Sequence, residues 1–144
     1  MKILFATDGS PCSIHAMREA ARLLPLADAD VSVVAVADVV PLASPYEVSG
    51  AAATLLLERE IETARKDLES ALGFLRTLGI KAHGIERHGE PAAEILAVAE
   101  EFAPDMIIVG SHGRNAVERL FLGSVSDAIA HHFHGPVLII RPKA

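Results

Sequence analysis

The sequence predicts a Rossmann-like α/β domain in which helices cover both faces of a doubly wound parallel sheet. Apolar runs of strand length alternate along the chain with segments whose apolar residues recur every three or four positions. The strand-like runs are continuously apolar, which is typical of parallel strands that are covered on both faces. With 144 residues, 51% of them hydrophobic, the chain is expected to form one domain over residues 1–144.

Five strands are expected. Four of them are the apolar runs Lys2–Thr7, Val31–Asp38, Asp105–Gly110 and Val137–Arg141. The fifth, Ile80–His88, is more polar and contains Gly84, so we expect it at an exposed edge of the sheet. Helices separate the strands, and right-handed crossovers are expected between parallel neighbours.

Four helices are expected. The first follows a capping residue at Ser10, with Pro11 in its first turn. The second has a stripe of apolar residues over positions 57–78, interpreted as core, and ends at Gly79. The third and fourth helices open at Pro91 and near Ser124.

One long irregular segment interrupts this pattern. Pro41–Ala53 contains two prolines and a glycine and is expected to be a loop. Loops of this length inside a compact domain are often lids over a binding site.

Composition and charge exclude several classes of protein. The formal charge is −6, with 13 Lys and Arg scattered among 19 Asp and Glu, so no basic field is expected to bind nucleic acid. The single cysteine, Cys12, excludes an intrachain disulfide and favours a reducing compartment. The apolar run Val31–Val40 contains Ser32 and Asp38 and is far shorter than the roughly 20 residues of a membrane span. A cytoplasmic protein with no membrane partner is expected.

Three glycines and a serine form the main candidate site: Gly110, Gly113, Gly123 and Ser124. Ligands of open α/β sheets bind beyond the carboxyl ends of the strands, where Gly110 is expected. Without a Cβ atom, glycine can take a positive φ and lets a ligand approach the backbone. Gly123 and Ser124 open a helix, whose free N–H groups and dipole favour phosphate. The segment Arg114–Leu122 would bring both N–H clusters around one polyphosphate, with Arg114 and Arg119 as charge partners.

Each glycine taken alone has an alternative explanation, because glycines are common at the ends of strands and before helices whether or not a ligand binds. The spacing matches neither G-x-G-x-x-G nor G-x-x-x-x-G-K-[ST], so the common dinucleotide fingerprint and the P-loop are both absent.

The other candidate side chains, Asp8, His112, Cys12 and three histidines near the C-terminus, each have a possible structural role as well. Asp8 is favoured as a ligand, although Asp-Gly-Ser is also common turn and cap chemistry. His112 could contact a phosphate or contribute only its backbone. Cys12 is interpreted as a small packed residue rather than a reactive thiol. The cluster His131, His132 and His134 lacks the spacing of a structural zinc site, so no metal site is assigned to it.

At these residues the sequence resembles the universal stress protein family, in particular its ATP-binding branch. The hallmark of that branch is G, two residues, G, nine residues, G, then Ser or Thr, and all four fixed positions match. The resemblance covers nearly the whole chain, through the segments "ILFATDGS", "HGEPAAEIL" and "GPVLIIRP". Ala6 departs from the family, where proline is frequent in nucleotide-binding members; a backbone contact there would lose little.

The resemblance implies a fold and a ligand. It implies strand order 3-2-1-4-5, with ATP between the first and fourth strands and Mg2+ or Mn2+ beside the triphosphate. It implies three groups of contacts: adenine near Ala6, Thr7, Asp8 and Val36; ribose and phosphates at Gly110, Ser111, His112, Gly113 and Arg114; and phosphates at Gly123, Ser124, Val125 and Ser126.

The closing strand Val137–Arg141 would be an apolar edge in this order, and edge pairing would bury it. The resemblance likewise implies a homodimer through that strand.

Three functions stay open at this point. The favoured one is an ATP-binding, dimeric, nucleotide-responsive module of stress tolerance. The others are a slow ATP hydrolase of the same fold and a dimeric scaffold that holds no nucleotide. No catalytic residue is assigned, because no base is identifiable beside a fixed water.

Overall fold

The computed structural model describes residues 1–39, 50–114 and 121–143. Its five strands are β1 (Lys2–Thr7), β2 (Asp30–Asp38), β3 (Ala82–Gly89), β4 (Met106–Gly110) and β5 (Val137–Ile140). All neighbouring pairs are parallel and form one sheet in the order β3-β2-β1-β4-β5. The expected fold class and strand order are therefore confirmed.

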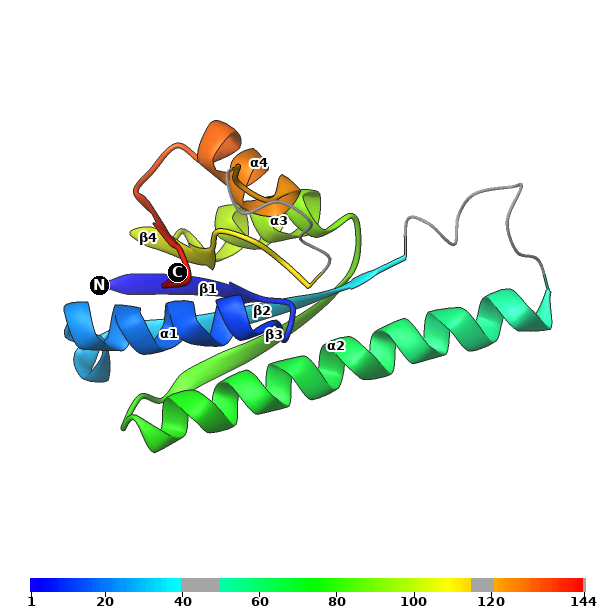
Figure 1. The fold of residues 1–144 in the computed structure, drawn as a ribbon, viewed down its shortest axis with the longest axis horizontal. Coiled ribbons are helices and arrows are strands. Elements are labelled where there is room, and N and C mark those ends of the chain that lie inside the picture. The colour runs from blue at the N-terminus through cyan, green and yellow to red at the C-terminus, as the bar shows by residue number, and fades with distance from the viewer. Residues whose placement is uncertain (40–49, 115–120, 144) are drawn as a thin grey trace.

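The helices form two layers around the sheet (Figure 1). They are α1 (Pro11–Leu23), the 3-10 turn η1 (Leu26–Asp28), α2 (Ala51–Thr77), α3 (Pro91–Phe102) and α4 (Ser124–His132). One apolar cluster joins α1 and α2 to the sheet, and a second joins α3 and α4 to its other face. Alternate strand residues face the two clusters: Ile3 and Phe5 lie in the first, whereas Leu4 lies in the second.

The helix ends follow the expected capping chemistry. The Ser10 side chain accepts a hydrogen bond from the Ser13 N–H at 3.2 Å, and Pro11 occupies the first turn of α1. Gly79 has a φ of 78°, a conformation that disfavours a side chain and ends α2. Pro91 opens α3 behind the cap residue Glu90.

The second helix extends beyond the sheet, which corrects two expectations. Its 27 residues span about 40 Å, whereas nine-residue β2 spans about 30 Å. Its buried residues lie in its C-terminal half, from Ala64 to Leu75, and Leu57 and Leu78 at the ends of the expected core stripe are exposed. The expected loop Pro41–Ala53 also extends too far, because α2 begins at Ala51. Apart from Gly50, the rest of that segment falls within residues 40–49, which lie outside the described part. No described helix, α2 included, is long and apolar enough to cross a membrane.

The edge strand β3 is held closely under α2. A Cβ atom on Gly84 would lie 2.8 Å from Leu72 Cδ1, so the glycine permits this contact. Arg65 Nε also donates to Glu86 Oε1 at 3.1 Å, linking α2 to β3. The polar segment thus lies at an edge, as its sequence predicts.

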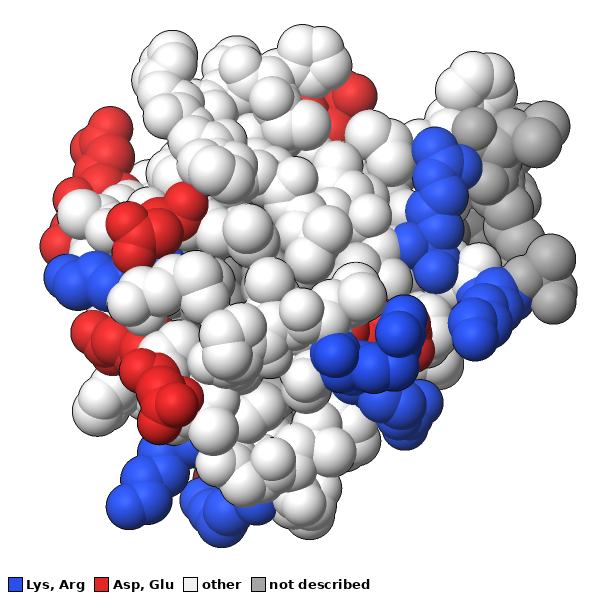
Figure 2. Space-filling view, turned by 90° about the vertical axis from the view of Figure 1, so that its left-hand side faces the viewer, with Lys and Arg blue, Asp and Glu red and all other residues white. Residues whose placement is uncertain are grey.

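Charged side chains of both signs lie mostly toward the periphery of the face shown in Figure 2, around a broad uncharged centre. Neither sign dominates that face.

Candidate functional site: a cleft at the carboxyl ends of the strands

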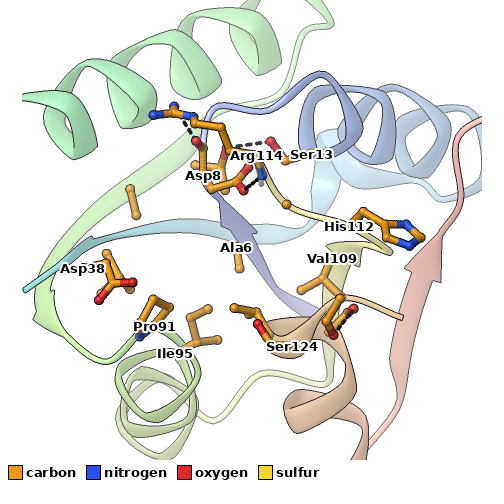
Figure 3. A pocket seen from close by; sticks show the side chains of 18 of the residues that line it. Ala6, Asp8, Ser13, Asp38, Pro91, Ile95, Val109, His112, Arg114 and Ser124 are labelled. Atoms are coloured by element: carbon orange, nitrogen blue, oxygen red, sulfur yellow. Dashed lines mark hydrogen bonds between the residues drawn. The ribbon is translucent and has the colours of Figure 1, made fainter. Parts of the chain in front are cut away.

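A cleft of about 630 Å³ opens beyond the carboxyl ends of β1, β2 and β4. It lies where the chain order of the strands reverses, between β1 and β4, which is the usual ligand position in such sheets. All residues predicted for the site except Ser111 line it: Ala6, Thr7, Asp8, Val36, Gly110, His112, Gly113, Arg114, Gly123, Ser124, Val125 and Ser126. Figure 3 shows many of these side chains around the cavity. Arg119 lies outside the described residues.

The three motif glycines permit close contacts within the protein. None of them has a positive φ, so the left-handed conformation that glycine allows is not used at these positions. A Cβ atom on Gly110 would lie 2.9 Å from Cys12 Sγ, and one on Gly113 would lie 2.7 Å from Asp8 Oδ2. A Cβ atom on Gly123 would lie 3.2 Å from the Ser111 carbonyl oxygen. Tight packing between segments therefore requires these glycines, whatever ligand the cleft holds.

Ser111 is fully buried and joins the loop after β4 to its neighbours. Its N–H donates to the Ile140 carbonyl at 3.0 Å, which connects it to β5. Its carbonyl accepts from the Gly123 N–H at 2.7 Å and from Ser126 Oγ at 2.9 Å. The structure thus places Ser111 as the anchor that fixes the start of α4 beside the loop, rather than on the surface of the cleft.

Asp8 holds two backbone segments together at the floor of the cleft. Its Oδ1 accepts from the Ser10 N–H at 2.9 Å, and its Oδ2 accepts from the Arg114 N–H at 2.8 Å. Both carboxylate oxygens therefore have a protein donor. The carboxylate nevertheless lines the cleft, so the turn role and a ligand contact are compatible.

Arg114 links this floor to α2. Its Nη2 donates to the Asp8 carbonyl at 2.6 Å and to Asp67 Oδ2 at 2.8 Å. Burial raises the pKa of the Asp67 carboxyl above its ordinary value, and the neighbouring Arg114 guanidinium opposes that shift. Sequence reasoning missed Asp67, although its spacing of three residues from Ala64 places the two on one helix face.

The start of α4 differs from the starts of α1 and α3. Ser10 caps α1, and the Glu90 carboxylate caps α3 by accepting from the N–H groups of Ala92 and Ala93. Gly123 provides no side-chain cap for α4. The first N–H groups of that helix, from Ser124 to Ser126, have no intrahelical partner and lie at the cleft. This helix start is suited to an anion.

The other end of the cleft is mostly apolar. Val36, Pro91 and Ile95 line it near the carboxyl end of β2. Asp38 lies there too, and its Oδ1 is buried with no hydrogen-bond partner among the described residues. Sequence reasoning missed Asp38, Pro91 and Ile95 as cleft residues; the two-residue spacing of Asp38 from Val36, which puts both on one face of β2, was the available signal.

The remaining candidate side chains have structural contacts. His112 Nδ1 lies 2.8 Å from Ser111 Oγ, and its Nε2 is buried without a partner among the described residues. Cys12 packs against Gly110, as its interpretation as a packed residue requires. His131 Nδ1 lies 2.8 Å from the Asp127 carbonyl. Within residues 1–39, 50–114 and 121–143, no three His, Cys, Asp or Glu side chains are grouped to hold a metal.

Comparison with known proteins identifies the family. Residues 1–141 match the model of the universal stress protein family. The chain is 35% identical to universal stress protein MJ0531 of Methanocaldococcus jannaschii, over 99% of this chain and 83% of that protein. It is 34% identical to universal stress protein YxiE of Bacillus subtilis, over 97% of this chain and 98% of that one.

Solved structures agree. The structure of MJ0577 superposes with a TM-score of 0.84 at 28% identity, covering 99% of this chain and 96% of that one. The universal stress protein of Archaeoglobus fulgidus in complex with dAMP shares the fold, with a TM-score of 0.70 at 24% identity and 97% of each chain covered. The cleft at the strand ends, lined by Gly110, Gly113 and Gly123, thus occurs in a chain that belongs to the universal stress protein family.

Proposed function

We propose that this protein binds ATP in the cleft and acts as a dimeric, nucleotide-responsive regulatory module. The observation that carries the proposal is the uncapped start of α4, whose first residues, Ser124 to Ser126, line the cleft. The neighbouring helix starts at the same edge are closed by Ser10 and Glu90. A phosphate group would therefore be favoured at α4.

Structures of similar fold support nucleotide binding in a general way. Universal stress proteins have been solved with cAMP and with dAMP, and an Arabidopsis thaliana member has been solved with AMP. At 16–24% identity these neighbours share the fold, and the choice of ATP for this chain is our proposal.

In the proposed complex, the phosphates lie at the N–H groups of Ser124, Val125 and Ser126 and close to Gly113. The base lies against Ala6 and Val36. Asp8, between these two ends, is placed for the ribose hydroxyls while it keeps its backbone contacts. Each of these residues lines the cleft.

A divalent cation fits the residues present. Mg2+ is commonly held by one or two carboxylates together with phosphate oxygens. Asp8 and Asp67 line the cleft close to Arg114, and either carboxylate could supply that contact. The cation would reduce the repulsion between these acids and the triphosphate.

Bound nucleotide would act through mass action. A ligand that binds only the folded state stabilises it by about 2.7 kcal/mol at a hundred times its Kd. The folded population, and any surface that depends on the loop after β4, would thereby follow the nucleotide concentration.

The test is to denature the purified protein and identify released nucleotide by mass spectrometry, followed by thermal melting with added ATP and Mg2+. Retained ATP without turnover, together with a rise in Tm, is the expected result. ADP with continuing phosphate release would instead indicate an ATP hydrolase. An empty cleft with no ATP-dependent shift would indicate a scaffold and would contradict the proposal.

The homodimer in this proposal forms through β5. Val137, Leu138 and Ile139 are apolar and only half-buried in the single chain. The strand lies at an edge of the sheet, with β4 on one side only. Pairing with a second copy would cover these side chains and complete the backbone hydrogen bonds of the edge.

A further inference from the structure

We propose that Asp38 determines which base the cleft accepts, because its carboxylate accepts a hydrogen bond from the exocyclic amine of adenine. This inference rests on the proposed nucleotide site and adds to it the residue that selects the base. It assigns a function to the buried Asp38 oxygen that has no donor in the described protein.

The other acids of the cleft are already engaged or exposed. Asp8 accepts from two backbone N–H groups, and Glu90 accepts from the first turn of α3. Asp67 accepts from Arg114, and Glu60 is exposed on α2. Asp38 is therefore the lining carboxylate whose buried oxygen lacks a donor among the described residues.

The position of Asp38 matches the base end of a nucleotide whose phosphates lie at α4. In the sheet, β1 separates β2 from β4, so the ends of β2 and β4 lie roughly 10 Å apart. The phosphate-binding helix follows β4, whereas Asp38 ends β2. Figure 3 shows Asp38 beside Pro91, away from Ser124.

The surroundings of Asp38 suit a flat heterocycle. Val36 lies on the same strand face two residues earlier, and Pro91 and Ile95 of α3 line the same part of the cleft. Apolar walls with one polar group are typical of sites that bind a ring and fix its orientation. Because Asp38 Oδ1 is already buried without a donor among the described residues, a base placed beside it would supply the hydrogen bond that this oxygen lacks.

The energetic reason is the cost of a buried acceptor without a donor. Hydrogen bonds to charged groups contribute about 1.5–3 kcal/mol, and an unpaired buried group costs a similar amount. Adenine presents an amine that can donate to Asp38. A purine that lacks the amine would leave the carboxylate unpaired in a site from which water is excluded.

The test compares ATP with purine riboside triphosphate, which has hydrogen in place of the amine. Wild-type protein is expected to bind ATP at least tenfold more tightly, about the ratio that one charged hydrogen bond provides. Asp38→Leu should bind the two nucleotides equally, mainly by losing affinity for ATP. Asp38→Asn keeps an acceptor oxygen and should keep a reduced preference. Glu60→Gln is the matched control, because it removes another acid of the cleft and should leave the preference unchanged.

Thermal melting without nucleotide separates selection of the base from a structural role. Asp38→Leu should melt at or above the wild-type Tm, since it removes a buried acceptor that has no donor. A large fall in Tm would mean that Asp38 supports the fold, and would overturn the inference.

Binding results can also overturn the inference. Equal affinity of the wild type for both nucleotides would reject the role of Asp38 alone, as would an ATP preference that survives in Asp38→Leu. Tighter binding of GTP than ATP would reject adenine as the selected base. Binding of neither nucleotide would instead reject the proposed function and this inference together.

Discussion

Arg114 Nη2 lies 2.8 Å from Asp67 Oδ2 and donates as well to the Asp8 carbonyl, 2.6 Å away. One guanidinium thus joins the turn after β1, the middle of α2 and the loop after β4. These segments are far apart in the sequence, yet together they form one side of the cleft. A triphosphate bound nearby would compete with Asp67 for hydrogen bonds from the Arg114 guanidinium.

Replacing Arg114 with alanine should weaken ATP binding about tenfold, because one charge-assisted contact is lost. Stability should change little, by less than about 1 kcal/mol, since the Arg114 side chain is 49% exposed and such pairs are screened by water. Calorimetry and urea unfolding measure the two effects. Arg22→Ala is the control, because it breaks an exposed pair with Glu19 at the end of α1 remote from the cleft. Unchanged ATP affinity in Arg114→Ala would contradict the assignment.

The stability difference between wild type and Asp67→Asn should depend on pH. Burial raises the pKa of Asp67 above its ordinary 3.8, against the opposing effect of Arg114, so the folded state holds this proton more tightly than the unfolded chain does. The resulting stabilisation is full below pH 3.8 and is lost as pH rises through the folded-state pKa. The amide in Asp67→Asn cannot titrate. As the pH rises through the folded-state pKa of Asp67, the wild type loses this stabilisation and the variant should become more stable relative to it. Urea unfolding at a series of pH values measures the difference.

Glu19→Gln provides a control of opposite sign for the Asp67 experiment. The hydrogen bond from Arg22 lowers the pKa of Glu19 below its ordinary 4.5. Its stabilisation is therefore present above pH 4.5 and is lost as pH falls through the folded-state pKa. Relative to wild type, this variant should lose stability as pH rises. The same trend in both variants would argue against the Asp67 prediction.

A β-branched residue at position 123 should abolish nucleotide binding without unfolding the protein. In Gly123→Val, the new Cβ would lie 3.2 Å from the Ser111 carbonyl oxygen and 3.3 Å from His112 Cα. These are backbone atoms, so the start of α4 must shift. The ATP-dependent rise in Tm should disappear while the circular dichroism spectrum is retained. A Tm shift equal to the wild type would count against phosphate binding at α4.

Gly73→Ala is the matched control for that substitution. Gly73 lies inside α2, and a Cβ atom there would meet nothing within 4 Å. Alanine should therefore raise stability by up to about 1 kcal/mol through helix propensity. Its ATP-dependent shift should match that of the wild type.

A lysine in the apolar edge strand should separate the proposed dimer. Leu138→Lys places a charge in β5, and edge lysines oppose strand pairing between chains. Light scattering should give twice the chain mass for wild type and a single chain mass for the variant, with circular dichroism to check folding. His83→Lys, at an exposed position of the opposite edge strand, should leave the mass unchanged. A wild-type monomer at high micromolar concentration would reject the dimer.

Local patterns predicted the fold and picked out three glycines, Gly110, Gly113 and Gly123, that line the cleft. Ser10, Gly79 and Pro91 marked helix ends correctly, because capping depends on neighbouring residues. The contact that excludes a side chain at Gly110 was not predicted, since the atom involved belongs to Cys12, which is distant in the sequence.

Contacts between distant segments explain the rest of what sequence reasoning missed. Asp67 was not predicted as a site residue, because its contact with Arg114 joins positions 47 residues apart in the sequence. By contrast, the Glu90 carboxylate closes the start of α3 through a local contact with the N–H groups of Ala92 and Ala93, a cap that the sequence analysis did not predict. Leu57 was expected in the core because it continues the apolar stripe of α2, but it is exposed. The spacing of apolar residues does not reveal where the sheet ends beneath the helix.

The unlike edges of the sheet have a consequence for the size of any assembly. The β3 edge carries Glu86 and Arg87 and is tied to α2 through Arg65, whereas β5 is short and apolar. If both edges were equally attractive, head-to-tail addition of β3 to β5 could propagate into an open-ended fibre. A charged edge opposite an apolar one disfavours that polymer, and association through β5 alone is complete after two chains.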